Sequence, residues 1–223
     1  MINSKTVESV LNEIVKKYKC FNSEAQFRDT FAIELSKECP NIKIYPEYTP
    51  AIKPKTLNID EDVIHFDLLV SDGKENILFE FKYKTKKFHF LTEQEIVLAN
   101  QEDTTNGRYA VWKDIQRIEC YVNDKKANID KGYMVFVTNY PTYFATPDKN
   151  TASYNFSIAP GVHKKAKVKN WLSVGKKGSI QKKNIKPLCI KNDYCFKYEK
   201  LNQLVDIDTK EEHIFYKMIL EIK

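Results

Sequence analysis

The stretch IHFDLLVSDGKENILFEFKYKT, residues 64–85, decides how this chain is expected to fold. Its two outer runs, IHFDLLV at 64–70 and ILFEFKYKT at 77–85, are rich in branched and aromatic residues, which is typical of buried β-strands. The SDGK sequence joins them, and Asp-Gly favours a tight turn. The stretch therefore predicts a β-hairpin with strands at 63–70 and 76–84.

Each predicted strand carries one carboxylate among apolar residues, Asp67 in the first and Glu80 in the second. Because side chains alternate along a strand, Glu80 and Lys82 share a face. A two-residue loop at 72–73 makes Glu80 the diagonal neighbour of Asp67, and a four-residue loop at 72–75 sets the two acids directly opposite. An odd loop length would put them on opposite faces. A buried charge needs a metal or a charged partner, so the pattern indicates a metal site or a cross-strand ion pair with lysine.

Helices and strands are predicted on both sides of the hairpin. Apolar periodicity predicts helices at 1–18, from Ser23 onward and at about 107–123, and strands at 42–48 and 133–138. Ser23 with Gln26 three residues later forms a capping box at the start of the second helix. The polar residues 92–106 are expected to be partly ordered or mobile, residues 145–200 are β-like and irregular, and 214–222 fit a strand or a helix. This order of elements favours an α/β fold with a central sheet.

Composition favours a folded cytoplasmic protein. Hydrophobic residues make up 42% of the 223 residues, which is enough for a full core. No apolar run approaches a membrane span, and the N-terminus lacks the apolar core of a signal peptide. The five cysteines show no Cys-x-x-Cys spacing, which favours reduced thiols, and the four histidines are scattered without metal-ligand spacing.

An acid on one strand followed by Glu-x-Lys on the next resembles the PD-(D/E)xK nuclease superfamily. The proline of that motif is absent, since His65-Phe66 precedes Asp67. The chain also resembles a group of uncharacterised bacterial members of the superfamily in the segments SEA at 23–25, EFKYKT at 80–85, GRY at 107–109, DIQRIE at 114–119 and VTN at 137–139. The acidic run 102–105 departs from the pattern, and the resemblance covers roughly residues 20 to 140.

The resemblance implies a restriction-endonuclease-like core, in which a mixed central β-sheet is flanked by helices. It also implies a Mg²⁺ or Mn²⁺ site made by Asp67, Glu80 and the backbone carbonyl of Phe81. Carboxylates are hard oxygen ligands that suit Mg²⁺, which usually keeps several waters. In such a site Lys82 holds or helps to deprotonate the attacking water and stabilises the transition state, with Lys84 as the alternative lysine. An ordinary exposed strand lysine is the competing interpretation of Lys82.

The resemblance further implies that a glutamate on the first core helix completes the metal shell. Glu24 lies three residues before Phe27 and seven before Phe31, so it faces inward on its helix. Glu34 is the alternative glutamate. An acid in the first turn also favours the helix dipole without any metal.

Polar residues of the predicted helix at 107–123 are candidate contacts to nucleic acid. Arg108, Gln116 and Arg117 are assigned this role, with Arg117 or Gln116 contacting phosphate or orienting Glu80. Asp114 lies three residues before Arg117 and can pair with it. A solvated helix face is the competing interpretation.

The segment from Lys164 to Lys200 holds twelve lysines against two acids. A basic segment suits a polyanionic substrate, and Lys176, Lys177 and Lys182 are taken as phosphate contacts. A solvated lysine surface explains the same composition, because the chain contains only three arginines. The aromatic residues of this region either stack on unpaired bases or belong to a β-rich core; they are Trp171, Tyr194, Phe196 and Tyr198.

These observations predict a catalytic core at 1–145 with a β-rich basic extension at 146–223 packed on the same domain. The expected function is that of a magnesium-dependent endonuclease, a hydrolase acting on DNA in preference to RNA, with no membrane partner. A homodimer or two sequential nicks would account for cleavage of both strands. The alternative is a catalytically inactive nucleic-acid-binding or assembly module on the same fold.

Overall fold

The structure is a computed structural model that describes residues 1–57, 63–91, 95–101, 103–173 and 186–223. The helices in these ranges are α1 (Ser4–Tyr18), α2 (Glu24–Glu38), α3 (Thr104–Val122) and the short 3-10 helices η1 (Pro141–Tyr143) and η2 (Tyr154–Phe156). The strands are β1 (Lys43–Tyr48), β2 (Phe66–Ser71), β3 (Asn76–Lys84), β4 (Phe88–Leu91), β5 (Glu95–Leu98), β6 (Lys131–Thr138), β7 (Gly161–His163), β8 (Ala166–Lys169), β9 (Leu188–Ile190), β10 (Tyr194–Phe196), β11 (Glu199–Val205) and β12 (Glu212–Ile222). Within these ranges no helix combines the length and apolar character that crossing a membrane requires.

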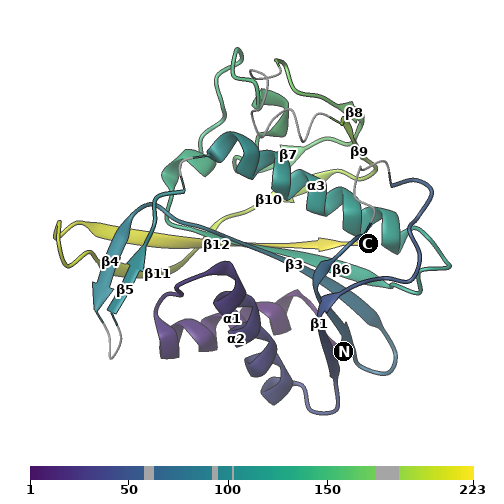
Figure 1. The fold of residues 1–223 in the computed structure, drawn as a ribbon, viewed down its shortest axis with the longest axis horizontal. Helices are drawn as coiled ribbons and strands as arrows, with labels where there is room; N and C mark the ends of the chain where they lie inside the picture. Colours follow the sequence, from purple (N-terminus) through teal and green to yellow (C-terminus); the bar gives the residue numbers. More distant parts are fainter. Residues whose placement is uncertain (58–62, 92–94, 102, 174–185) are drawn as a thin grey trace.

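A six-stranded mixed sheet with the order β1-β2-β3-β6-β12-β11 forms the centre of the molecule. β3 and β6 run parallel and are connected through α3, and the other neighbouring strands are antiparallel. Helices α1 and α2 cover one face of the sheet and α3 covers the other (Figure 1). The predicted α/β fold with a mixed central sheet flanked by helices is therefore confirmed.

The sheet is buried on both faces, which explains why its central strands are apolar throughout. All eight residues of β6 are buried. Phe136 belongs to the apolar cluster under α3, and its neighbour Val135 belongs to the cluster under α1 and α2. Strands covered on both sides lose the alternation of apolar and polar residues.

The predicted hairpin is confirmed, with the four-residue loop. Ser71 pairs with Asn76, so the loop is 72–75, and Gly73 has a φ of 82°, a region that favours glycine. The Asp72 carboxylate accepts hydrogen bonds from two backbone amides of the loop. An even loop keeps Asp67 and Glu80 on the same face of the sheet, as the metal-site hypothesis requires.

The three predicted helices are present, with differences at their starts. Ser23 Oγ accepts from Gln26 N, but the Gln26 side chain accepts from Asn22 N, so only half of the predicted capping box forms. The third helix begins at Thr104, earlier than predicted, because the Asp103 side chain accepts from Asn106 N and caps it.

Residues 95–98 are more ordered than the sequence indicated. They form β5, which pairs antiparallel with β4 from Phe88/Leu98 to Leu91/Glu95. Each strand is four residues long and exposes part of its surface, so the apolar pattern was too short to identify.

The last strands of the chain belong to the central sheet. β12 is a strand rather than a helix and pairs with β6 from Tyr216/Thr138 to Ile222/Gly132. The sheet therefore continues past the predicted boundary at residue 145. Outside the sheet, the described residues between η2 and β10, 154–173 and 186–196, pack over α3 (Figure 1).

A histidine joins the β4–β5 hairpin to the turn between β11 and β12. His89 Nδ1 lies 3.0 Å from Asp208 Oδ2, and His89 Nε2 lies 2.7 Å from Glu95 Oε1. The His89 backbone N–H also donates to Asp206 Oδ2, at 2.8 Å. Only the imidazolium form can donate from both ring nitrogens and so satisfy both carboxylates. The hydrogen bond to Asp208, followed by that to Glu95, raises the pKa of His89.

We expect replacement of His89 by glutamine to destabilise the protein in a pH-dependent way. Because the folded-state pKa is raised, the stabilisation is present below the unfolded-state value of about 6.5 and is lost as the pH rises through the folded-state pKa. The difference in unfolding free energy between wild type and His89→Gln should therefore be larger at about pH 6 than at about pH 9. Urea unfolding across this range measures it, with His65→Gln as the control. A difference that does not change with pH would contradict the imidazolium assignment.

Candidate active site

The ladder between β2 and β3 ends before β3 does. Its last pair is Leu68 with Phe79, and β3 continues to Lys84 beyond it. Beyond this pair, carboxylates accept hydrogen bonds from the backbone amides of β3 that have no partner on β2. Phe81 N donates to Asp67 Oδ2 at 2.7 Å.

Glu24 accepts a hydrogen bond from the next β3 amide that has no partner on β2. Its Oε2 accepts from Tyr83 N at 2.8 Å, and its Oε1 lies 3.7 Å from Lys82 Nζ. Buried backbone donors need a partner, and here the partners are side chains of α2 and β2. Asp67 and Glu24 keep 21% and 35% of their side chains exposed, so this opened edge of β3 faces solvent.

Lys82 lies at the centre of the cluster and is mostly buried. Its ammonium is 2.9 Å from Asp114 Oδ2, on α3, and donates to the Phe81 carbonyl at 3.0 Å. Burial alone would lower the pKa of Lys82, but the Asp114 and Glu24 carboxylates raise it above the ordinary value. Lys82 therefore carries its charge at neutral pH.

Arg117 links Asp114 to Glu80. Its Nη1 lies 3.0 Å from Asp114 Oδ1, which confirms the predicted pairing of these two residues on the helix. Its Nη2 lies 3.2 Å from Glu80 Oε1 and donates to the His65 carbonyl, and the guanidinium stacks on Phe66 with 5.0 Å to the ring centroid. Because Lys82 and Arg117 flank Asp114, they hold the pKa of that buried carboxyl below its usual value, although burial acts in the opposite direction.

Glu80 is the most constrained acid of the cluster. It is 3% exposed, and its Oε1 is buried without a hydrogen bond. Burial and the nearby Asp114 carboxylate raise the pKa of Glu80 well above its ordinary value, although Arg117 and Lys82 act in the opposite direction. Asp67 stands opposite Glu80 when the register of Leu68 with Phe79 is continued by one residue, and its charge adds to the same rise. This carboxylate is incompletely compensated by the protein.

A third cation, Arg28 on α2, lies at the outer side of the cluster. It pairs with Glu47 and with Asp29, and its Nη1 is 3.9 Å from Asp67 Oδ1. The carboxylates of the cluster are Asp67, Glu80, Glu24 and Asp114. Two cations, Lys82 and Arg117, lie among them, and Arg28 is shared with Glu47 and Asp29, so the acids outnumber the cations.

The predicted catalytic residues are brought together by the fold. Asp67, Glu80, Lys82 and Glu24 come from three elements and meet at the opened edge of β3. The alternative glutamate, Glu34, pairs instead with Lys17 at 2.6 Å and with Lys37 at 3.2 Å. No ion pair of Lys84 with the clustered carboxylates occurs in the described part of the chain.

All three predicted nucleic-acid contacts on α3 are buried. Arg117, 8% exposed, pairs with Glu80, which fits the alternative role of orienting that acid. Arg108 is 4% exposed, and its Nη2 donates to the Thr142 and Ala145 carbonyls. Gln116 is 1% exposed, and its Oε1 accepts from Cys189 N. The residues that follow β6 cover Arg108 and the C-terminal region covers Gln116, so neither side chain is available to a phosphate in this conformation. The competing interpretation, a solvated helix face, does not hold either, because this face of α3 is a buried polar interface.

Glu119 illustrates how α3 holds the C-terminal segment. It is fully buried and accepts from the backbone amides of Lys191 and Asn192 and from the Tyr194 hydroxyl. The aromatic residues of the basic region support the core interpretation, since Trp171, Tyr194 and Phe196 are at most 9% exposed. Lys176, Lys177 and Lys182 lie outside the described residues.

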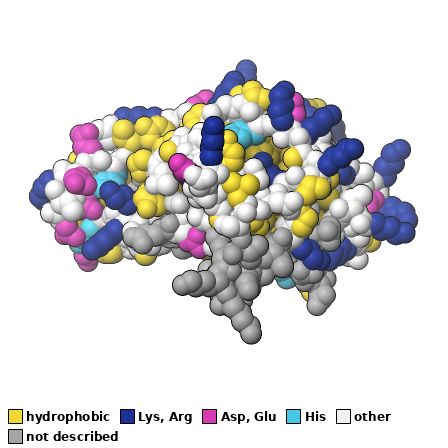
Figure 2. Space-filling view, turned by 90° about the horizontal axis from the view of Figure 1, so that it is seen from above, with side chains coloured by type: hydrophobic (Ala, Val, Ile, Leu, Met, Phe, Trp, Pro, Cys, Tyr) yellow, Lys and Arg dark blue, Asp and Glu magenta, His cyan; other side chains and the backbone are white. Residues whose placement is uncertain are grey.

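The face formed by the C-terminal segment over α3 has an uneven charge distribution (Figure 2). Lys and Arg side chains are most numerous over its right half, and Asp and Glu side chains gather at its left end, where β4 and β5 lie in Figure 1.

Sequence reasoning missed Arg28 and the contact between Asp114 and Lys82. A signal was present, because arginine is rare in this lysine-rich chain. All three arginines, Arg28, Arg108 and Arg117, are at least largely buried, where a planar guanidinium that stays charged is favoured over lysine.

The residues of the cluster fit a divalent cation. The predicted set was Asp67, Glu80, Glu24 and the Phe81 carbonyl, but no group of three or more His, Cys, Asp or Glu side chains that could hold a metal occurs among the described residues. Two carboxylates, Asp67 and Glu80, remain as ligands, together with the Phe81 carbonyl, which accepts from Lys82. The oxygen without a hydrogen bond, Glu80 Oε1, is a hard donor beside Asp67. Mg²⁺ commonly uses one or two carboxylates and retains waters.

No family model, no curated protein and no solved structure matches this chain. The chemistry of the site is therefore inferred from its own residues.

Proposed function

We propose that this chain is a metal-dependent nuclease with a restriction-endonuclease-like core that hydrolyses phosphodiester bonds, in DNA in preference to RNA. The observation that carries the proposal is the meeting of Asp67, Glu80 and a charged Lys82 where β2 leaves the edge of β3. The order around this site is α2, the strands β1, β2 and β3, the β4–β5 hairpin, α3 and the parallel strand β6. This order, with the hairpin as an insertion, supports the same fold.

Asp67, Glu80 and the Phe81 carbonyl would hold Mg²⁺ or Mn²⁺, with Glu24 beside them. The bound ion would supply polarisation of the phosphate and activation of water. A charged Lys82 is suited to stabilising the negative charge that develops on the phosphate, and not to accepting a proton from water. Asp114 and Arg117 fix Lys82 and Glu80 in place.

The basic character of the C-terminal region supports a polyanionic substrate. Over the right half of the face in Figure 2, Lys and Arg side chains are more numerous than Asp and Glu side chains. Phosphate contacts made by such side chains carry no base information. Nicked or linear products from a plasmid would distinguish single-strand cleavage from cleavage of both strands, which a homodimer would perform.

One observation favours the alternative, a nucleic-acid-binding or assembly module without catalysis. The acids of the cluster already have protein cations as partners, with Lys82 beside Asp114 and Arg117 beside Glu80. A buried ion-pair network of this kind can be purely structural.

We expect purified protein to cleave nucleic acid with Mg²⁺ or Mn²⁺ and to be inactive in EDTA. Supercoiled plasmid, linear duplex, single-stranded DNA and RNA are the substrates, and DNA should be cleaved faster. Calorimetry should detect Mn²⁺ binding that Asp67→Asn abolishes and that Glu13→Gln, at an exposed ion pair, leaves unchanged. Absence of both cleavage and Asp67-dependent metal binding would favour the binding module instead.

A further inference from the structure

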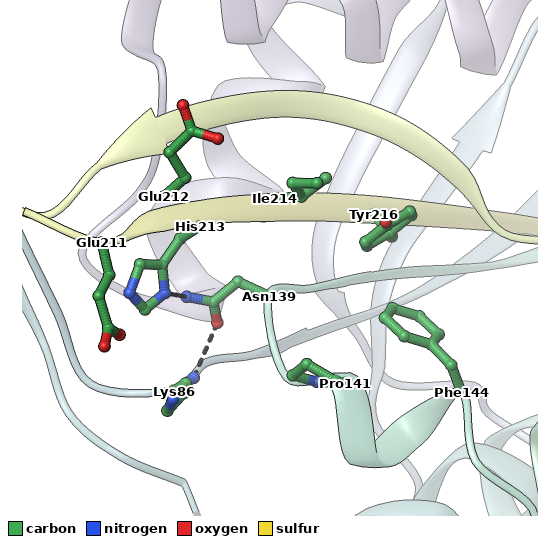
Figure 3. Close-up of a pocket in the computed structure, with 9 residues that line it drawn as sticks. All are labelled: Lys86, Asn139, Pro141, Phe144, Glu211, Glu212, His213, Ile214 and Tyr216. Atoms are coloured by element: carbon green, nitrogen blue, oxygen red, sulfur yellow. Dashed lines mark hydrogen bonds between the residues drawn. The ribbon is translucent and has the colours of Figure 1, made fainter.

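A second candidate site lies where the ladder between β6 and β12 ends (Figure 3). β6 ends at the pair of Thr138 with Tyr216, and beyond it a hollow of about 230 Å³ lies beside the first residues of β12. Lys86 after β3, Asn139 after β6, and residues of η1 and β12 line it. The proposed catalytic residues do not contribute to it.

The polar end of the hollow has a fixed hydrogen-bond pattern. Asn139 Oδ1 accepts from Lys86 N at 2.8 Å, which sets the orientation of the amide. Asn139 Nδ2 then faces His213 Nδ1 at 3.3 Å, so this ring nitrogen must accept. The His213 proton is therefore on Nε2, and burial lowers the pKa of the ring, which keeps it neutral.

His213 is held rigidly as a hydrogen-bond donor. Its ring packs on Phe88, with 5.0 Å between centroids, and it is 8% exposed. The exposed side chain of Lys86 and the carboxylate of Glu211 lie at the same end of the hollow, while Glu212 points away from it (Figure 3). Donors and an acceptor lie side by side here, which suits a ligand that offers both and disfavours a bare phosphate.

The other end of the hollow is apolar and aromatic. Phe144 and Tyr216 meet edge to face, with 4.7 Å between ring centroids, and Pro141 lies beside them. Flat rings stack on such surfaces regardless of sequence. The volume is below the range of about 300 to 1,000 Å³ of sites for drug-sized ligands, so the hollow fits one ring system of a longer ligand.

The apolar end of the hollow, at Tyr216, lies on the same sheet face as the proposed catalytic lysine, whereas His213 alternates to the other face and packs there on Phe88. The hollow therefore lies at the end of the sheet and is open to both of its faces. Across the sheet, Lys84, Thr138 and Tyr216 form one row, and Lys82, Phe136 and Met218 form the next. Ideal sheet spacings place Lys82 and Tyr216 about 12 Å apart. A nucleic-acid strand with a phosphate at Lys82 would reach the hollow within a few nucleotides.

We propose that this hollow binds one unpaired nucleobase of the substrate strand. The ring stacks against Phe144 and Tyr216, the His213 Nε2–H and the Lys86 ammonium donate to the base or its phosphate, and Glu211 accepts from an amino group of the base. The inference rests on the proposed action on nucleic acid, but it does not require catalysis.

The test uses short single-stranded DNA with 2-aminopurine at one position in each oligonucleotide, titrated with protein in EDTA. Stacking quenches 2-aminopurine, so wild type should quench one position of the series. Phe144→Leu, which keeps apolar volume at the site, should remove the quenching and weaken binding about tenfold. Lys86→Ala changes an exposed residue and should weaken the quenching without affecting the fold.

Matched controls separate the site from general effects. Lys87→Ala removes a neighbouring exposed lysine that does not line the hollow, and Tyr18→Leu removes an exposed aromatic on α1. Both variants should quench the 2-aminopurine fluorescence as strongly as the wild type does. Quenching that survives in Phe144→Leu, or quenching at no position, overturns the site. Cleavage with Mg²⁺ but no quenching would reject this base-binding site and leave the nuclease proposal intact. Quenching without cleavage would support the base-binding site and reject the nuclease proposal.

Discussion

Lys82→Ala should reduce the rate of cleavage by on the order of a hundredfold or more, the usual scale for losing a positioned charge in an active site. Lys82 is held charged by the carboxylates around it, close to where a phosphate would meet Asp67 and Glu80. Single-turnover cleavage of labelled duplex with Mg²⁺ measures the effect. Lys84→Ala, one pleat further along β3, should cleave at nearly the wild-type rate.

The Lys82→Ala variant must also be checked for a loss of stability. Because Lys82 is the partner of a buried carboxylate, its removal is expected to affect folding as well as catalysis. Lys82→Met, which retains the aliphatic volume, should show the same loss of cleavage. If Lys84→Ala loses activity and Lys82→Ala does not, Lys84 is the catalytic lysine.

Asp114→Ala should destabilise the protein by about 3 to 5 kcal/mol, the cost of leaving a buried charge without its partner. Asp114 is 4% exposed and pairs with both Lys82 and Arg117. Removing Lys82 together with Asp114 should cost less than the sum of the single changes, because each change alone leaves the other charge buried. Urea unfolding of the single and double variants measures the coupling.

An exposed ion pair of the same chain provides the comparison. Glu13 and Lys16 pair at 2.5 Å on the surface of α1, and Glu13→Gln should change stability by less than about 1 kcal/mol. Equal effects of Asp114→Ala and Glu13→Gln would show that the cluster contributes little to folding.

The candidate site was predictable where it depends on local spacing. Strand alternation places Glu80 and Lys82 on one face, and an even loop is sufficient to bring Asp67 to the same face. The choice between loops of two and four residues was not predictable, because it depends on how Asp72 binds the loop amides.

The environment of α3 was not predictable from its own sequence. Its polar residues suit a solvated surface, but the segment that covers them lies about seventy residues further along the chain, as the contacts of Gln116 with Cys189 and of Glu119 with Lys191 show. Periodicity does not report such long-range partners. The contact between Asp114 and Lys82 was not predicted for the same reason, because it joins a helix to a strand far away in the sequence.

The opened edge of β3 also bears on the solubility of the protein. Unpaired amides on a strand edge are a template on which a neighbouring molecule can add a strand and begin to aggregate. At Phe81 and Tyr83 these amides are already bound by Asp67 and Glu24. An incoming backbone would find no donors there and would meet negative charge. The chain thus keeps a gap in its sheet without offering it to other copies of itself.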